Sequence, residues 1–328
     1  MSLPLLQVRG LSVSLARSAA AEMAVLNDIS FVLEKGQTLG IVGESGSGKS
    51  LLALAIIGLL PPLMRIRGRI DLDGLDLLSL DEDELCRVRG RRVGMIFQEP
   101  MTALNPAMTI GDQIAEGIVW HRGVSWCEGR REAVRLLEQV RISDAVSRAR
   151  NYPHELSGGQ RQRVGIAIAL AAGPELLIAD EPTTALDVTV QGEILDILAE
   201  HVRTGDMAMI LVSHDLGVIA RSCERMIVLY AGARMEEGPT RSVLERPDNP
   251  YTRGLLAAIP ERRAGETRLA AIPGTVPGFS ELPQGCRFSD RCPERIAACL
   301  AAEPHWQDLG EGRGVRCIRA GRGGEVLA

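Results

Sequence analysis

The chain has 328 residues, which is enough for one large domain and an extension. It is 45% hydrophobic and 24% charged, with a formal net charge of −5 and only 3% aromatic residues. This balance argues against a basic nucleic-acid-binding surface and against aromatic platforms that stack single strands.

The amino-terminal segment Met1–Leu15 lacks the basic stretch and continuous apolar run of a secretory signal. The longest apolar segment, Leu51–Met64, is interrupted by Gly58, Pro61 and Pro62 and is too short to span a bilayer. We expect it to form a buried helix. The composition therefore predicts a soluble, cytoplasmic protein that could still dock on a membrane protein.

Short apolar, β-branched segments alternate with helical patterns along the chain, which predicts an α/β domain with a mostly parallel sheet. Strands are predicted at residues 38–42, 93–97, 176–179, 208–212 and 226–230. The first strand leads into a glycine-rich turn and a helix that starts at about Lys49. Each strand ends beside a polar residue, and open α/β sheets bind their ligands at these carboxyl ends.

The region between Glu99 and Gly173 is mostly helical in pattern; residues 130–140, for example, repeat apolar side chains every 3.6 residues. We expect a helical subdomain at about 99–173, inserted into the sheet core. Proline and glycine become denser after Glu245, so we predict one domain over 1–245 and a small cysteine-rich extension over 246–328.

The segment Gly43–Ser50 fits the phosphate-loop pattern G-x-x-x-x-G-K-[ST] between a predicted strand and a predicted helix. Its residues are Gly43, Glu44, Ser45, Gly46, Ser47, Gly48, Lys49 and Ser50. Backbone amides and the helix start would bind phosphates, Lys49 would reach the β- and γ-phosphates, and Ser50 would ligate Mg²⁺. A chance glycine-rich turn is the plain alternative. By itself the loop predicts only a nucleoside triphosphate.

Carboxylates and polar groups follow three other predicted strands. Asp180 and Glu181 follow residues 176–179; we expect Asp180 to hold Mg²⁺ and Glu181 to activate the attacking water. Gln98 could touch both the metal and the water, and His214 could hydrogen-bond the γ-phosphate. The alternatives are ordinary structural roles, such as a helix-terminal charge for Glu181.

The segment Leu156–Gln160 precedes a helix predicted over residues 162–171. Ser157, Gly158, Gly159 and Gln160 would form a second anion-binding helix start, for which a monomer with one phosphate loop has no evident use. We interpret it as a cap for nucleotide held by a partner subunit. The alternative is a helix that Ser157 merely caps.

These motifs resemble, in order and spacing, those of ABC-transporter ATPase subunits, over about residues 5–245. The resemblance includes residues 184–187 and Ser213-His214-Asp215. Within that family the chain resembles the subunits of oligopeptide and dipeptide importers. The segments that carry this finer resemblance are residues 98–106, 249–256, 285–288 and 291–293.

The resemblance implies an ATPase at the cytoplasmic face of the inner membrane, bound peripherally to two membrane-spanning permease subunits and served by an extracytoplasmic binding protein. ATP would be sandwiched between two ATPase subunits, with Asp187 at the seam, and we expect a heterodimer. The stretch after Gln98 would receive a coupling helix. The family's adenine-stacking aromatic is missing between Ser12 and Val25, so Leu15 or another apolar residue must serve.

Four of the seven cysteines crowd near the end of the chain, at Cys286, Cys292, Cys299 and Cys317. Four thiolates within this stretch suit a metal, and the absence of close C-x₂-C pairs favours a [4Fe–4S] cluster over zinc. The alternative is a set of buried cysteines that act as small hydrophobic residues.

Two other functions keep part of this machinery. A soluble ABC-type ATPase of DNA repair or translation is disfavoured, because the chain has one phosphate loop and no long heptad tract. Import of nickel, opines or glycosides would use a similar subunit, and no residue of the chain distinguishes these cargoes from peptides.

Overall fold

The structure is a computed structural model of the chain. It describes residues 4–18, 21–98, 104–184, 187–205, 207–259 and 271–320. Two compact units form: the first comprises residues 1–6, 33–37 and 72–211, and the second comprises 7–32, 38–71 and 212–328. Within the described ranges, the helices are all too short or too polar to cross a bilayer.

The first unit contains a parallel core and a group of helices. Its strands are β5 (Leu75–Asp76), β6 (Val93–Ile96), β7 (Leu176–Asp180) and β8 (Ala208–Ser213), the last of which continues into the second unit. Its helices are η1 (Leu77–Ser79), α2 (Glu82–Val88), α4 (Ile110–Arg122), α5 (Trp126–Gln139), α6 (Ala145–Arg148), η2 (Pro153–Glu155), α7 (Gly158–Leu170) and α8 (Val188–Gly205).

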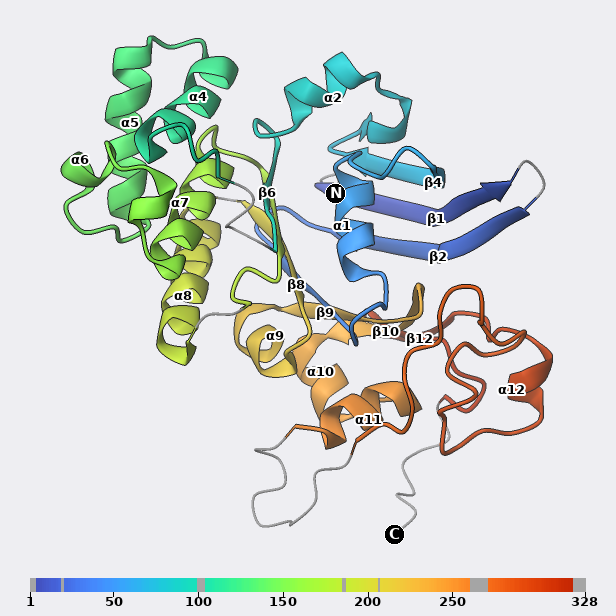
Figure 1. The fold of residues 1–328 in the computed structure, drawn as a ribbon. Coiled ribbons are helices and arrows are strands. Elements are labelled where there is room, and N and C mark those ends of the chain that lie inside the picture. The colour runs from blue at the N-terminus through green and yellow to red at the C-terminus, as the bar shows by residue number, and fades with distance from the viewer. Residues whose placement is uncertain are drawn as a thin grey trace. The chain divides into compact units, whose positions relative to one another are not determined.

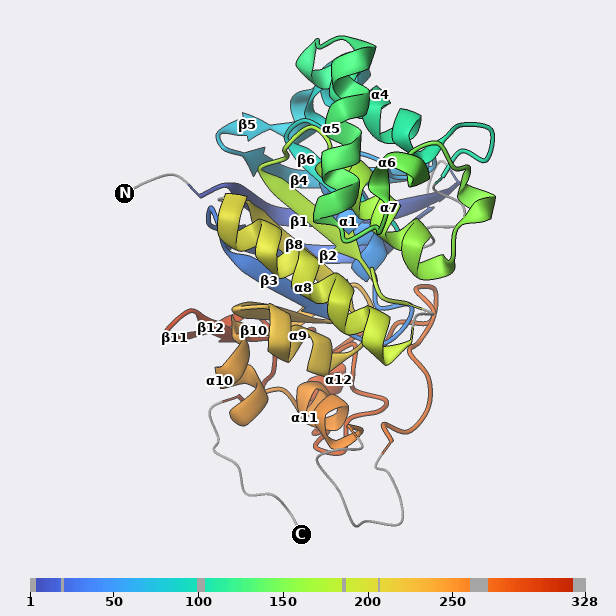
Figure 2. The ribbon, with the colours of Figure 1, turned by 90° about the vertical axis from the view of Figure 1, so that its left-hand side faces the viewer.

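Strands β8, β7 and β6 lie in that order, and β6 runs parallel to β7 with Ile96 opposite Ala179. The fully buried sequence of β7 explains its place in the sheet, since strands covered on both faces read as continuous apolar runs. Helices α4 and α5 lie side by side, and both pack on α7 (Figures 1 and 2). The predicted helix over 130–140 is therefore confirmed, although it starts earlier, at Trp126, behind the capping residue Ser125.

The second unit contains a mixed sheet and the carboxyl-terminal region. Its strands are β1 (Leu6–Ser18), β2 (Ala21–Leu33), β3 (Thr38–Val42), β4 (Met64–Leu72), β9 (Arg225–Tyr230), β10 (Ala233–Pro239), β11 (Gln307–Gly310) and β12 (Arg313–Val315). Its helices are α1 (Lys49–Ile56), α9 (Leu216–Ser222), α10 (Thr240–Glu245), α11 (Pro250–Ala257) and α12 (Ala298–Ala301).

The strand order in this unit is β4-β1-β2-β10-β9-β3, with the first three visible side by side in blue (Figure 1). Strand β3 runs parallel to β9, with Ile41 opposite Ile227. Strand β10 runs antiparallel to both β9 and β12, and β11 pairs with β12. These antiparallel pairs join the carboxyl-terminal residues to the sheet, a feature that the sequence did not predict.

One predicted element is wrong. The segment Leu51–Met64 is not a single buried helix, because α1 ends at Ile56 and β4 begins at Met64. Gly58 adopts a left-handed conformation with φ 68°, and the prolines at 61 and 62 prevent the helix from resuming. Leu63 is 67% exposed, so the apolar run is divided between a buried helix and a surface connection.

Candidate functional site

The loop Gly43–Ser50 connects the buried strand β3 to helix α1, as predicted. A Cβ atom on Gly43 would lie 2.2 Å from the carbonyl oxygen of Leu229, so only glycine fits there. Gly48 caps α1 with φ 99°, and a Cβ atom there would lie 2.7 Å from a methyl of Leu26. The loop therefore has the close backbone approaches that a phosphate cradle requires.

Two side chains inside this loop fit a phosphate ligand. Lys49 is 5% exposed, and its Nζ donates to the carbonyl oxygens of Gly43 at 2.8 Å and Glu44 at 3.1 Å. The Ser47 hydroxyl is buried and has no hydrogen-bond partner among the described residues. Buried hydroxyls are normally hydrogen-bonded, so an oxygen-rich anion would supply what Ser47 lacks.

The second group of predicted residues lies in the first unit. Asp180 ends β7 and is 4% exposed, and Glu181 follows it with φ 46°, a left-handed conformation that is uncommon outside glycine. The Glu181 carboxylate accepts from Thr184 Oγ1 at 2.9 Å and from Gln98 Nε2 at 3.3 Å. The structure thus brings two predicted catalytic side chains, Gln98 and Glu181, together. The left-handed backbone at Glu181 is the kind of strain that concentrates at functional sites.

The glycine-rich segment 157–160 forms the exposed amino terminus of helix α7. Ser157 is the capping residue: its Oγ accepts from the amide of Gln160 at 3.3 Å, and the Gln160 side chain accepts from the amide of Ser157 at 3.0 Å. The helix starts at Gly158, four residues earlier than predicted. Asp187 likewise accepts from the amide of Val190 in the first turn of α8.

The remaining predicted residue, His214, follows β8 and is exposed in the second unit, just before Asp215 caps α9. The predicted site residues thus divide between the units. In the first unit lie Gln98, Ser157, Gly158, Gly159, Gln160, Asp180, Glu181 and Asp187, and in the second lie residues 43–50, His214 and the four late cysteines. Parts of two segments that carry the family resemblance, residues 99–103 of 98–106 and residues 185–186 of 184–187, lie outside the described residues.

The four late cysteines line one cavity of about 20 Å³, which holds little more than a water molecule. Among the residues that the structure describes, no three acidic, histidine or cysteine side chains are arranged as metal ligands. Burial raises the pKa of Cys286 to about 12 and that of Cys292 to about 11, so these thiols are protonated near neutral pH. The structure therefore does not support the predicted [4Fe–4S] cluster or zinc site.

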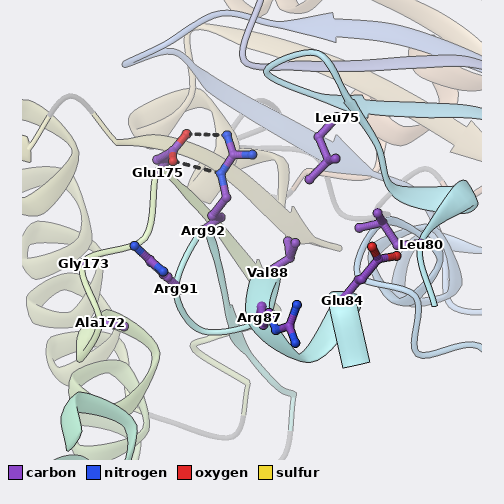
Figure 3. Close-up of a pocket in the computed structure, with 10 residues that line it drawn as sticks. All are labelled: Leu75, Leu80, Glu84, Arg87, Val88, Arg91, Arg92, Ala172, Gly173 and Glu175. Atoms are coloured by element: carbon purple, nitrogen blue, oxygen red, sulfur yellow. Dashed lines mark hydrogen bonds and ion pairs between the residues drawn. The ribbon is translucent and has the colours of Figure 1, made fainter. Parts of the chain in front are cut away.

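A larger pocket of about 620 Å³ lies in the first unit (Figure 3). It is lined by Leu75, Leu80, Glu84, Arg87, Val88, Arg91, Arg92, Ala172, Gly173 and Glu175. Arg92 and Glu175, which form a two-point ion pair at 3.0 Å, directly precede β6 and β7. The pocket is thus at the amino ends of these strands, whereas Gln98 and Asp180 lie at their carboxyl ends, where such sheets bind ligands.

Sequence reasoning missed the side chains that hold the phosphate loop from outside. The hydroxyl of Tyr251 in α11 accepts a hydrogen bond from the backbone amide of Glu44. The guanidinium of Arg291 donates to the side-chain carboxylate of Glu44. Both residues fall in segments that carry the resemblance to peptide importers, which was the available signal. It gave no reason to connect them with the loop. Thr184, whose hydroxyl donates to Glu181, lies in the segment 184–187 that carries the family resemblance, but the sequence indicated no role for it.

Comparisons with known proteins agree with these motifs. The ABC transporter family matches residues 26–184, and the oligopeptide/dipeptide transporter carboxyl-terminal region matches residues 235–299. The chain is 48% identical to the oligopeptide transport ATP-binding protein OppD of Escherichia coli over 301 residues, covering 92% of this chain and 89% of that protein. OppD of Salmonella typhimurium is 47% identical over 300 residues, with the same coverage.

A solved structure supports the fold. The ATP-binding cassette MJ0796, in a dimeric post-hydrolysis state bound to ADP and Pi, superposes with a TM-score of 0.64 at 30% sequence identity, covering 72% of this chain and 99% of that one. The fold, the phosphate loop and the near full-length relatives agree. The chain belongs to the ABC transporter ATP-binding proteins of the oligopeptide/dipeptide type.

Proposed function

We propose that this protein hydrolyses MgATP to drive the uptake of di- or oligopeptides. The observation that carries the proposal is the phosphate loop, where Gly43 admits no side chain and the buried hydroxyl of Ser47 has no hydrogen-bond partner among the described residues. The peptide cargo is supported by the relatives, which are named for oligopeptide transport and match over nine-tenths of the chain. Import of nickel, opines or glycosides has no such support.

Each residue has a proposed part in the reaction. The loop amides and Lys49 would bind the phosphates, and the Ser50 hydroxyl, the Asp180 carboxylate and the Gln98 amide would supply the oxygen ligands that Mg²⁺ prefers. Bound Mg²⁺ would neutralise charge that develops on the phosphates. Glu181 accepts a proton from the attacking water, and the hydrogen bonds that its carboxylate accepts from Thr184 and Gln98 support this role. His214 donates a hydrogen bond to the γ-phosphate.

The partners follow from the second anion-binding helix start. Residues 157–160 and Asp187 would contact ATP that is held by another ATPase subunit, and we favour a heterodimer. The exposure of Ser157 and the dimeric state of the MJ0796 cassette support this arrangement. Two permease subunits would anchor the pair at the cytoplasmic face of the inner membrane, with a binding protein outside. The expected coupling-helix contact after Gln98 lies beyond the described residues.

We also infer that 1–245 is the nucleotide-binding domain, with its helical subdomain at about 99–173, and that 246–328 is a carboxyl-terminal extension of the oligopeptide-importer type. The packing of α4, α5 and α7 on one another supports the helical subdomain. The only remaining support for a metal bound by the four late cysteines is that all four line one cavity. Anaerobically purified protein without stoichiometric iron or zinc would exclude it.

ATP hydrolysis tests the proposal directly. Glu181→Gln should bind MgATP but hydrolyse it slower by roughly two to three orders of magnitude, since positioned proton transfer contributes about 10²–10⁴-fold. Lys49→Ala should instead weaken nucleotide binding itself. Glu175→Gln is a matched control, because this carboxylate lies at the opposite end of the same strand. A Glu181→Gln variant with parental hydrolysis would remove Glu181 from its proposed role.

A further inference from the structure

A residue near the end of the chain binds the side chain of the phosphate loop. Arg291 Nη1 donates to Glu44 Oε2 at 2.8 Å, and Nη2 donates to Glu44 Oε1 at 2.9 Å. The Arg291 side chain is only 6% exposed, while that of Glu44 is 30% exposed. Two parallel, charge-assisted bonds of this kind fix both the position and the orientation of a carboxylate.

Arg291 is itself held in place by its other donors. Its Nε donates to the carbonyl oxygen of Pro273 at 2.8 Å, Nη2 also donates to that of Gly274 at 3.2 Å, and Nη1 reaches the Tyr230 hydroxyl at 3.4 Å. Burial opposes the charge of this guanidinium, but the bonds to Glu44 and Tyr230 outweigh it and raise the pKa of Arg291. The guanidinium is therefore charged and rigidly placed.

A second contact holds the backbone of the same loop residue. The amide of Glu44 donates to the Tyr251 hydroxyl at 2.9 Å. Tyr251 is fully buried and packs on Tyr230 and Phe288 with ring centroids 4.7 and 5.2 Å away. The carboxyl-terminal region therefore fixes both the backbone and the side chain of Glu44.

This arrangement bears on a problem that the sequence of the loop creates. Glu44 places a negative charge in a loop that is built for phosphates, and like charges at close range repel strongly. The carbonyl oxygen of the same residue accepts from Lys49, so displacement of Glu44 would also displace the lysine. An unpaired, mobile Glu44 carboxylate would therefore oppose nucleotide binding in two ways.

We propose that Arg291 is a positioning residue for ATP binding, which neutralises the Glu44 carboxylate and keeps it away from the phosphates. The carboxyl-terminal region thereby sets the affinity of the phosphate loop. This inference rests on the proposed function, since it presupposes that the loop binds ATP. Coupling is reciprocal, so bound nucleotide should in turn stabilise the segment around Arg291.

The test measures MgATP binding to the purified full-length protein by calorimetry. Arg291→Ala should weaken binding roughly tenfold, within the range of typical coupling between sites. Adding Glu44→Gln to that variant should restore most of the affinity, because the unpaired charge is gone. Arg291→Lys should give an intermediate loss, since an ammonium group cannot make the two-point contact. Arg295→Ala is the control, as Arg295 is half-exposed and lies 4.0 Å from Asp290.

The rescue by Glu44→Gln separates a positioning role of Arg291 from a merely structural one. If the role were merely structural, Arg291→Ala would lower the melting temperature, and adding Glu44→Gln would not restore the ATP affinity. Hydrogen exchange adds a readout on the parent protein: MgATP should protect residues 272–274 and 286–291. Parental ATP affinity in Arg291→Ala, or no rescue in the double variant, would overturn the inference. If the parent failed to bind MgATP, or Lys49→Ala bound it equally well, the proposed function itself would fall.

Discussion

Gly232, in the turn between β9 and β10, gives the sharpest prediction of stability. It adopts φ +78°, and a Cβ atom there would lie 1.7 Å from the carbonyl oxygen of Val25. Replacement by alanine costs about 1–2 kcal/mol for the left-handed backbone and about 1–3 kcal/mol for overpacking. We expect Gly232→Ala to lower the free energy of unfolding by about 2–5 kcal/mol.

Gly232→Ala should also disturb the backbone of the phosphate loop. The amide of Gly232 donates to the carbonyl oxygen of Ser47 at 2.9 Å, and its own carbonyl oxygen accepts from the amide of Asn27 at 2.8 Å. Relief of the clash with Val25 requires movement of the Gly232 backbone, because the obstructing atom belongs to a strand rather than to a flexible side chain. MgATP affinity should therefore fall together with stability.

Gly310→Ala provides the matched control. Gly310 has nearly the same φ, +77°, but an added Cβ atom there meets nothing within 4 Å. The difference between the two variants in urea unfolding, followed by circular dichroism, thus isolates the contact with Val25. Equal losses of stability in the two variants, or unchanged ATP affinity in Gly232→Ala, would refute the reasoning.

Two further predictions concern buried charges and thiols. Glu237→Ala should cost roughly 3–5 kcal/mol in urea unfolding, because it leaves the buried guanidinium of Arg234 without its partner, and a loss below 1 kcal/mol would contradict this. In metal-free protein at pH 8, Cys286 and Cys292 should react with a thiol reagent far more slowly than the exposed Cys86, since burial raises their pKa to about 12 and 11. Equal reaction rates in the folded state would show that the cavity admits the reagent.

The strands that carry the site could be predicted because each is a short, wholly buried run that ends in polar residues. Residues 38–42 and 176–179 appear in the structure as β3 and β7 with almost the same bounds. The helix expected over Leu51–Met64 failed for a physical reason, since hydrophobicity alone does not distinguish a helix from a connection. Gly58 and two prolines decided the outcome.

Contacts between distant residues could not be predicted from local patterns. Arg291 and Glu44 are separated by most of the chain, and neither periodicity nor motif spacing relates them. The four late cysteines show a similar limit. Their spacing predicted a metal site, whereas the structure places all four around one cavity without a metal-ligand arrangement among the described residues. That arrangement depends on packing that a spacing pattern does not encode.

The capping residue of helix α7, Ser157, can both cap the helix and donate a hydrogen bond outward. The Ser157 oxygen accepts a hydrogen bond from Gln160, and a hydroxyl that accepts still carries a hydrogen that it can donate. Serine can thus start the helix and offer its proton to an outside anion at the same time. Aspartate at 157 would start the helix equally well but would meet that anion with a like charge. Serine therefore satisfies both demands at this position, whereas aspartate would satisfy only the first.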